Sequence, residues 1–212
     1  MSDFPLPKRT TYRHGDLHHA LIAAGTELAR VGGPDAVVLR EATRRVGVAP
    51  NAAYRHFADR RALLDAVCSA AQSLLAVAIE QELASVKAAG DPAARARARL
   101  RAVGTGYVRF ALTEPGLFRT AFSALRDLQK IGDPARAGAS GLSPFLLLGS
   151  VLDELVDAGA LPKERRPAAE FLAWSSVHGL AMLLIDGPLR ALDKKKTHAI
   201  IERLLDMVEQ GL

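Results

Sequence analysis

The chain has 212 residues, carries a net charge of +5 and is 49% hydrophobic but only 5% aromatic. This length allows one or two domains with a proper core, and the single cysteine, Cys68, excludes an internal disulfide. The sequence has no continuous apolar run of about 18 residues, so no membrane span is predicted. Its N-terminal end lacks the apolar run of a signal peptide. We therefore expect a cytoplasmic protein with no membrane partner.

The first fifteen residues are basic and contain two prolines, with no apolar periodicity. Lys8, Arg9 and Arg13 supply the positive charge. Such an arm can lie along a phosphate backbone or in a minor groove. A tail without a role is the alternative.

The segment from residue 39 to 64 predicts two short helices joined by a tight turn. Leu39, Ala42 and Val46 recur at helical spacing, and Gly47 follows where a left-handed residue ends a helix. Pro50 is placed at the first position of a second helix, predicted over residues 50–57. A helix so short must be held by packing, which is the arrangement of a helix-turn-helix motif.

Six arginines against two acids give the stretch from residue 39 to 61 a local charge of +4. Arg60 and Arg61 open the next helix, where the helix dipole disfavours cations, and a bound phosphate would compensate. For any single arginine, a solvated charged face is the alternative.

These features resemble the DNA-binding region of the TetR (tetracycline-repressor-like) family of bacterial transcription regulators. The similarity covers about residues 10 to 70 and is carried by residues 12–17, 39–41, 47–48, 54–57 and 63–64. Val38 and Ala49 stand where the family usually has Ser or Thr caps, and Arg60 stands where lysine is usual. The resemblance implies a three-helix helix-turn-helix domain over residues 1–62.

It also implies roles for single residues. Asn51 and Ala52 would lie nearest the base edges, and asparagine can pair with adenine through two hydrogen bonds. A plain helix-start residue is the alternative for Asn51. The full set of predicted DNA contacts is Arg9, Thr43, Arg44, Asn51, Ala52, Tyr54, His56 and Arg60.

The rest of the chain predicts further helices and no strand, hence an all-α protein with about nine helices. Asp59 is the expected N-cap of a helix to about residue 88. Further helices are expected over residues 92–113, 117–128, 144–158, 167–185 and 194–210. The Gly- and Ala-rich residues 132–141 are the best candidate for a mobile loop.

A second resemblance lies in this C-terminal part, predicted as one domain over residues 63–212. Trp174, His178 and Gly179 are similar to a C-terminal domain class named after its Trp-His-Gly signature, and residues 114–119 and 186–187 fit the same class. The resemblance implies a domain that binds an effector and dimerises, without a known ligand.

Two apolar stripes predict a homodimer through the last two helices. The residues are Ile201, Leu204, Leu205 and Val208 on the last helix, and Phe171, Trp174, Ser175, His178 and Met182 on the one before. They suit a two-fold four-helix bundle. Internal packing of both stripes is the alternative.

Bulky or polar-tipped residues in the C-terminal helices are candidates for an effector pocket, and ordinary core is the alternative for each. The candidates are Tyr107, Phe110, Phe118, Phe122, Trp174, His178 and Met182. Their composition favours a largely apolar effector.

No catalytic motif, cofactor or metal is predicted. His14 and His18 have a spacing that suits a metal, but no third ligand is evident, and Cys68 has no histidine partner in sequence. We therefore expect a regulator that binds a palindromic double-stranded DNA operator as a homodimer, a repressor released by a small apolar effector. The alternative is a helical ligand-binding or adaptor protein whose DNA binding ignores sequence and weakens uniformly with salt.

Overall fold

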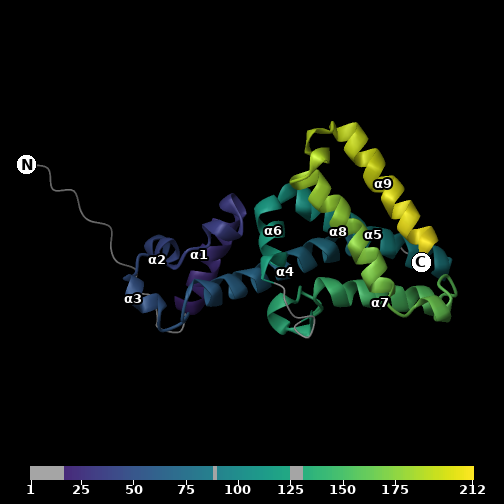
Figure 1. Ribbon diagram of the computed structural model, residues 1–212. Coiled ribbons are helices and arrows are strands. Elements are labelled where there is room, and N and C mark those ends of the chain that lie inside the picture. The colour runs from purple at the N-terminus through teal and green to yellow at the C-terminus, as the bar shows by residue number, and fades with distance from the viewer. Residues whose placement is uncertain (1–16, 88–89, 125–130) are drawn as a thin grey trace, which may run out of the picture.

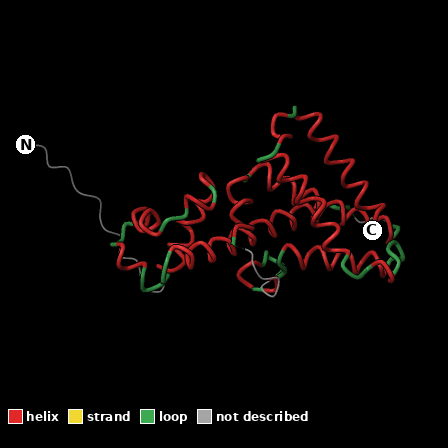
Figure 2. The backbone as a smooth tube through the Cα atoms, in the orientation of Figure 1, coloured by secondary structure: helices red, strands yellow, loops and turns green. Residues whose placement is uncertain are grey.

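The computed structural model describes residues 17–87, 90–124 and 131–212, and within them it contains nine α-helices and no strand (Figures 1 and 2). The predicted all-α class is confirmed, while the N-terminal arm with Arg9 lies outside the described residues. The helices are α1 (Leu17–Gly32), α2 (Leu39–Val46), α3 (Pro50–Ala53), α4 (Arg60–Ser85), α5 (Pro92–Thr113), α6 (Pro115–Ser123), α7 (Pro144–Asp157), α8 (Ala169–Ile185) and α9 (Lys194–Gly211).

Helices α1, α2 and α3 form a small unit at one end of the molecule (Figure 1). Gly47 ends α2 in the left-handed region, at φ 76°, as the sequence predicts, and its N–H bonds to carbonyls of the preceding turn. The α-helical part of α3 is shorter than the predicted 50–57. A turn follows it, and the N–H of Phe57 still reaches the carbonyl of Ala53 at 2.9 Å.

Helix α4 connects this unit to the rest of the protein. Its 26 residues span about 39 Å, at about 1.5 Å per residue. Asp59 caps it as predicted, since its carboxylate accepts the N–H of Ala62 at 2.8 Å. The domain boundary predicted between residues 62 and 63 falls inside this helix.

Helix α4 is also the one described helix that is long and apolar enough to cross a membrane. Its mean hydropathy reaches 1.8 over 18 residues, but half of that window is buried inside the protein, where α4 packs on α1, α5 and α6. The buried side includes Leu63, Val67, Leu75 and Ile79. Its apolar character therefore matches a core helix.

The C-terminal helices form a bundle around α5, which packs against α4, α7, α8 and α9. Asp91 and Ser143 cap α5 and α7 as predicted. Helix α6 begins at Pro115, two residues earlier than predicted, because the proline occupies its first position. Helices α8 and α9 lie at the end away from α1–α3 (Figure 1).

The loop over residues 132–141, the best candidate for a mobile loop in the sequence, makes specific contacts along its central part. Residues Pro134–Arg136 form a short 3-10 helix, and the carboxylate of Glu80 accepts the N–H groups of Ala139 and Ser140, both at 2.9 Å. Burial raises the pKa of Glu80, but these bonds and the Ser140 hydroxyl outweigh it and leave the pKa below its usual value. The loop is held because α4 supplies a hydrogen-bond acceptor that composition does not reveal.

Candidate DNA-binding surface and effector pocket

The outer face of α3 presents polar and aromatic side chains to solvent. Asn51 is exposed at its start, and Tyr54 is 58% exposed at its end. Arg40 and Arg55 are exposed beside them. Ala53 is fully buried, so the inner face of the helix is fixed by packing. This is the geometry that a recognition helix requires: a rigid inner side and a free outer side.

Two predicted contacts on α2 differ in their surroundings. Arg44 is exposed, but its guanidinium already binds the carboxylate of Glu41 with two hydrogen bonds of 2.9 and 2.6 Å. Thr43 is only 1% exposed, and its hydroxyl donates to the carbonyl of Arg40 at 2.8 Å. Thr43 therefore serves packing, and its predicted contact with DNA has no exposed surface through which to form.

Arg60 has partners within the protein. Its Nε donates to the carbonyl of Val37 at 2.8 Å, and Nη2 donates to that of Pro34 at 2.7 Å. These carbonyls offset the unfavourable position of a cation at the start of α4, the role that the sequence assigned to a phosphate. A contact of Arg60 with DNA stays a prediction.

His56 is half-buried and lies beside α1. The ring of His18 stacks on Phe57 at 4.8 Å and lies 6.1 Å from the ring of His56. Burial lowers the pKa of His18, and the neighbouring His19 and His56 lower it further. In the described parts of the chain no three His, Cys, Asp or Glu residues converge as metal ligands, and His14 lies outside them.

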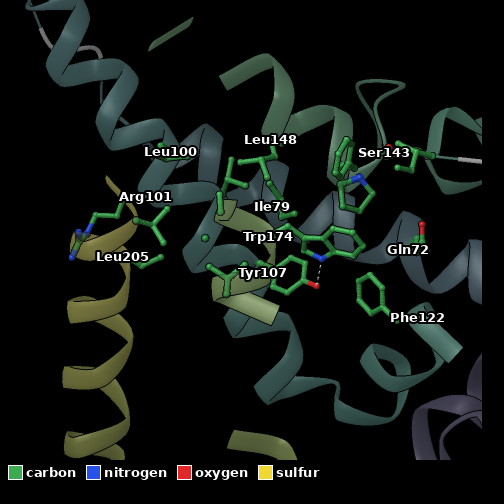
Figure 3. Close-up of a pocket in the computed structure, with 18 of the residues that line it drawn as sticks. Gln72, Ile79, Leu100, Arg101, Tyr107, Phe122, Ser143, Leu148, Trp174 and Leu205 are labelled. Atoms are coloured by element: carbon green, nitrogen blue, oxygen red, sulfur yellow. Dashed lines mark hydrogen bonds between the residues drawn. The ribbon is translucent and has the colours of Figure 1, made fainter. Parts of the chain in front are cut away.

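A cavity of about 60 Å³ lies inside the C-terminal bundle, between α4, α5, α7, α8 and α9 (Figure 3). Its wall is mostly apolar. The lining residues are Gln72, Ile79, Leu100, Arg101, Val103, Gly104, Tyr107, Phe122, Ile131, Arg136, Ser143, Pro144, Phe145, Leu148, Ala173, Trp174, Val177, Leu205 and Val208.

Three of the predicted pocket residues, Tyr107, Phe122 and Trp174, line this cavity. The other four, Phe110, Phe118, His178 and Met182, are not part of its wall. Phe118 is fully buried behind Tyr107, at a ring distance of 5.3 Å. Sequence reasoning missed Gln72 and Arg136, since a polar residue in a helix and an arginine in a loop carry no signal for a pocket.

The signature residues Trp174 and His178 are joined through Tyr107. The indole Nε1 of Trp174 donates to Tyr107 Oη at 3.0 Å (Figure 3), and Oη lies 2.8 Å from Nδ1 of His178. Burial raises the pKa of Tyr107 and lowers that of His178. Both groups are therefore neutral, and together they tie α5 to α8 at the edge of the cavity.

The start of α6 is the point where the bundle meets the N-terminal unit. Glu114 forms an ion pair with Arg30 at the end of α1. Gly116 lies so close to the carbonyls of Ala29 and Arg30 that a β-carbon would collide with them. The residues of the motif at 114–119 thus hold α6 against α1.

An exposed, basic helix-turn-helix joined by one long helix to a bundle with an internal cavity defines a DNA-binding transcription regulator. Residues 21–67 match the model of the bacterial regulatory proteins of the tetR family, and residues 100–208, just over half of the chain, match the tetracyclin repressor-like C-terminal domain. The chain belongs to the TetR family.

Solved structures have the same fold. A protein of unknown function from Rhodococcus sp. RHA1 is 25% identical, with a TM-score of 0.73 over 96% of this chain and 99% of that one. A TetR-family transcriptional regulator from Pectobacterium atrosepticum is 20% identical, with a TM-score of 0.61 over 96% of each chain. No curated protein matches this sequence.

Proposed function

We propose that this protein is a cytoplasmic repressor that binds a palindromic operator as a homodimer and is released by a small, largely apolar effector. In this proposal residues 1–62 bind DNA, and residues 63–212 bind the effector and dimerise. The observation that carries it is the outer face of α3, where Asn51 and Tyr54 are exposed on a helix whose inner side is buried.

Helices α8 and α9 supply the proposed dimer interface. The outward face of α8 has Leu172, 60% exposed, and Leu183, separated by the small exposed residues Ser175 and Gly179. Small residues between apolar ones allow a second helix to approach closely. Met207, 56% exposed, extends the apolar surface onto α9.

The stripe predicted on α9 contributes to this face only in part. Leu205 and Val208 are buried within the protomer, where Leu205 lies against Gly104 of α5. The outward side of α9 is instead formed by Ile200, Leu204 and Met207. The apolar residues of α9 thus divide between an internal and an external face.

The position of α4 suggests how an effector would release the protein from its operator. Gln72 at the middle of α4 and Ile79 in its second half line the cavity, and only residues 54–59 separate its start from α3. A cavity of about 60 Å³ holds only a few water molecules, so a larger ligand must move the surrounding helices apart. A ligand that favours the widened form would shift the two recognition helices away from half-sites roughly 34–36 Å apart.

The test is selection of bound duplexes from a random library by the purified full-length protein at about 150 mM salt. Recovery of a palindrome is expected. Asn51→Ala should relax the preference at one or two positions, because it removes a base contact worth about 1–3 kcal/mol. Tyr54→Phe should weaken binding to all sequences alike, because it removes a backbone contact.

Enrichment of no sequence, with binding that only falls with salt, would favour the adaptor alternative. Lys163→Gln is a control, since it lowers the net charge by the same amount as the loss of one arginine near α3, and Lys163 is exposed in the short 3-10 helix between α7 and α8, outside the proposed DNA and dimer surfaces. It should leave the selected sequence unchanged.

A further inference from the structure

Two arginines line the cavity, and their surroundings differ. Arg101 donates to Glu202 at 2.5 Å and to Asp206 at 2.6 Å. Arg136 is only 7% exposed, and its Nε and Nη1 have no hydrogen-bond partner among the described residues. Among the described residues these two buried N–H groups are unsatisfied, which is unfavourable, and a bound anion would satisfy them.

Two acids that share a second hollow with Arg136 do not pair with it. Arg136 also lines this hollow, which Asp65, Asp133 and Cys68 border. Within the described part of the chain neither carboxylate comes within 4.0 Å of the guanidinium. Asp133 instead accepts the N–H of Ala135 at 2.9 Å.

Arg136 is held firmly at one side of the cavity. It ends the 3-10 helix of the loop, and the carbonyl of the next residue, Ala137, accepts the hydroxyl of Ser73 at 2.6 Å. Ser73 follows Gln72, another residue of the wall. In Figure 3, Gln72 and Ser143 lie at the end of the cavity away from Arg101.

The N-terminus of α7 opens onto the same end. Ser143 is buried, lines the cavity and caps the 14-residue helix by accepting the N–H of Leu146 at 3.4 Å. Its own hydroxyl proton has no acceptor among the residues described, so Ser143 can donate to a ligand. The positive end of the helix dipole favours an anion there as well.

The remainder of the wall is apolar. From this end toward Arg101 the wall is formed by Trp174, then Ile79 and Leu148, then Leu205 (Figure 3). Val177 also lines it. A small hydrated anion would lose its water in such surroundings without gaining contacts for most of the cavity. A ligand whose chemistry matches this wall has one anionic group and an apolar body, and one larger than a few water molecules must move the surrounding helices apart.

We propose that the effector is an amphipathic monocarboxylate, whose carboxylate binds Arg136 and the hydroxyl of Ser143 and whose hydrocarbon body lies among Ile79, Leu148 and Trp174. That this ligand is the effector rests on the proposed function. That the cavity binds such a ligand does not, and it is tested without DNA.

Trp174 is the only tryptophan of the chain, so its fluorescence reports on the cavity directly. The full-length protein is titrated with decanoate, decanol and decylamine, which share one chain length, and with the pair 4-phenylbutyrate and 4-phenylbutanol. We expect each carboxylate to bind about tenfold or more tightly than its alcohol, because a charged hydrogen bond is made only by the acid. Decylamine should bind most weakly.

Variants separate the two arginines. Arg136→Met keeps the length of the side chain and should abolish the preference for the acid, while Arg136→Lys keeps the charge and part of the preference. Arg101→Gln, in the same cavity, should leave the ratio of acid to alcohol unchanged. Without ligand, Arg136→Met should melt no lower than the wild type, since it removes a buried charge whose Nε and Nη1 find no partner within residues 17–87, 90–124 and 131–212.

Four results overturn the inference: equal binding of acid and alcohol, a preference that survives in Arg136→Met, inorganic phosphate that competes as well as decanoate, or no binding of either carboxylate to the folded protein. None of these four results bears on whether the protein selects an operator. Conversely, if decanoate binds without altering operator affinity, that result supports ligand binding in the cavity and overturns only the release of the protein from DNA by this ligand.

Discussion

The phenol of Tyr107 and the imidazole of His178 are joined at 2.8 Å between Oη and Nδ1. Because the described residues offer the phenol proton no other acceptor, it points at Nδ1, and the neutral ring of His178 carries its proton on Nε2. Trp174 donates to the same phenol oxygen at 3.0 Å. The Trp-His part of the sequence signature is therefore a hydrogen-bonded link between α5 and α8.

Replacing Tyr107 with Phe should destabilise the protein. The change leaves the indole N–H of Trp174 and the Nδ1 of His178 without their shared partner, at a cost of about 1–3 kcal/mol for buried groups. Thermal unfolding should show a Tm lower by about 2–4 °C for each kcal/mol. Tyr54→Phe, on the exposed surface, is the matched control and should not change the Tm. Equal Tm values for Tyr107→Phe and Tyr54→Phe would show that the hydrogen bonds of Tyr107 contribute nothing to stability.

Two half-buried histidines predict how stability depends on pH. Burial lowers the pKa of His178, and burial with nearby histidines lowers that of His18, from an ordinary value of 6.5. As the pH drops through and below 6.5, the unfolded chain binds more protons than the folded one, so the free energy of unfolding falls. The stabilising contribution of the neutral histidines is fully present above that pH. Chemical unfolding at a series of pH values measures the slope.

His178→Gln should reduce this slope, because it removes one of the two groups that take up a proton on unfolding. His198→Gln is a suitable comparison, since that histidine is exposed on α9. A slope that is the same in wild type and His178→Gln would contradict a neutral, buried His178.

Gly116→Ala should destabilise the contact between the bundle and the DNA-binding unit. Its β-carbon would collide with backbone carbonyls of α1, which cannot move aside as a flexible side chain can. Overpacking of this kind costs about 1–3 kcal/mol. Hydrogen exchange should report greater opening of α1 and α6 together.

Gly149→Ala is the matched control for that experiment. Gly149 also lies within a helix, but its β-carbon would make ordinary contacts, 3.5 Å to the carboxylate of Glu170. The gain in helix propensity, up to about 1 kcal/mol, should make this variant as stable as the wild type or more so. Similar losses in both variants would mean that the close approach of α6 to α1 is unimportant.

Gly179→Glu should convert the proposed dimer into a monomer. A β-carbon at Gly179 meets nothing within the protomer, so the fold should survive, while a charged side chain would be buried between two copies of α8. Sedimentation or light scattering measures the mass, and operator affinity should fall with it. Gly90→Glu adds the same charge in an open loop position and should remain dimeric. A dimeric Gly179→Glu would place the interface elsewhere.

The local signals in the sequence were sufficient for the presence of the helices and for several of their ends, but not for the end of α3 or the start of α6. Asp59, Asp91 and Ser143 cap α4, α5 and α7 because each side chain reaches N–H groups two or three residues along the chain. Gly47 ends α2 because glycine adopts a positive φ without strain. Such features involve neighbours in sequence, and therefore composition and spacing predict them.

The DNA-binding unit was predictable to nearly the same degree, because its motif is short and continuous. The sequence did not reveal how two of the predicted contact residues are oriented. Thr43 turns inward and Arg60 binds the carbonyls of Pro34 and Val37, which lie more than twenty residues before it. Which side of a short helix faces solvent depends on the packing of α1 and α4 against it.

The sequence by itself determined the helical class, the helix-turn-helix and the presence of a second helical region, since these depend on periodicity and turns. Tertiary structure alone decided which residues enclose the cavity, which side of α9 is free, and that Glu80 holds a loop rich in Gly and Ala. It also decided that Arg101 is paired, while Nε and Nη1 of Arg136 have no partner in the described part of the chain. The reason is physical: burial and pairing depend on groups distant in sequence, so the fold must bring them together before their chemistry is defined.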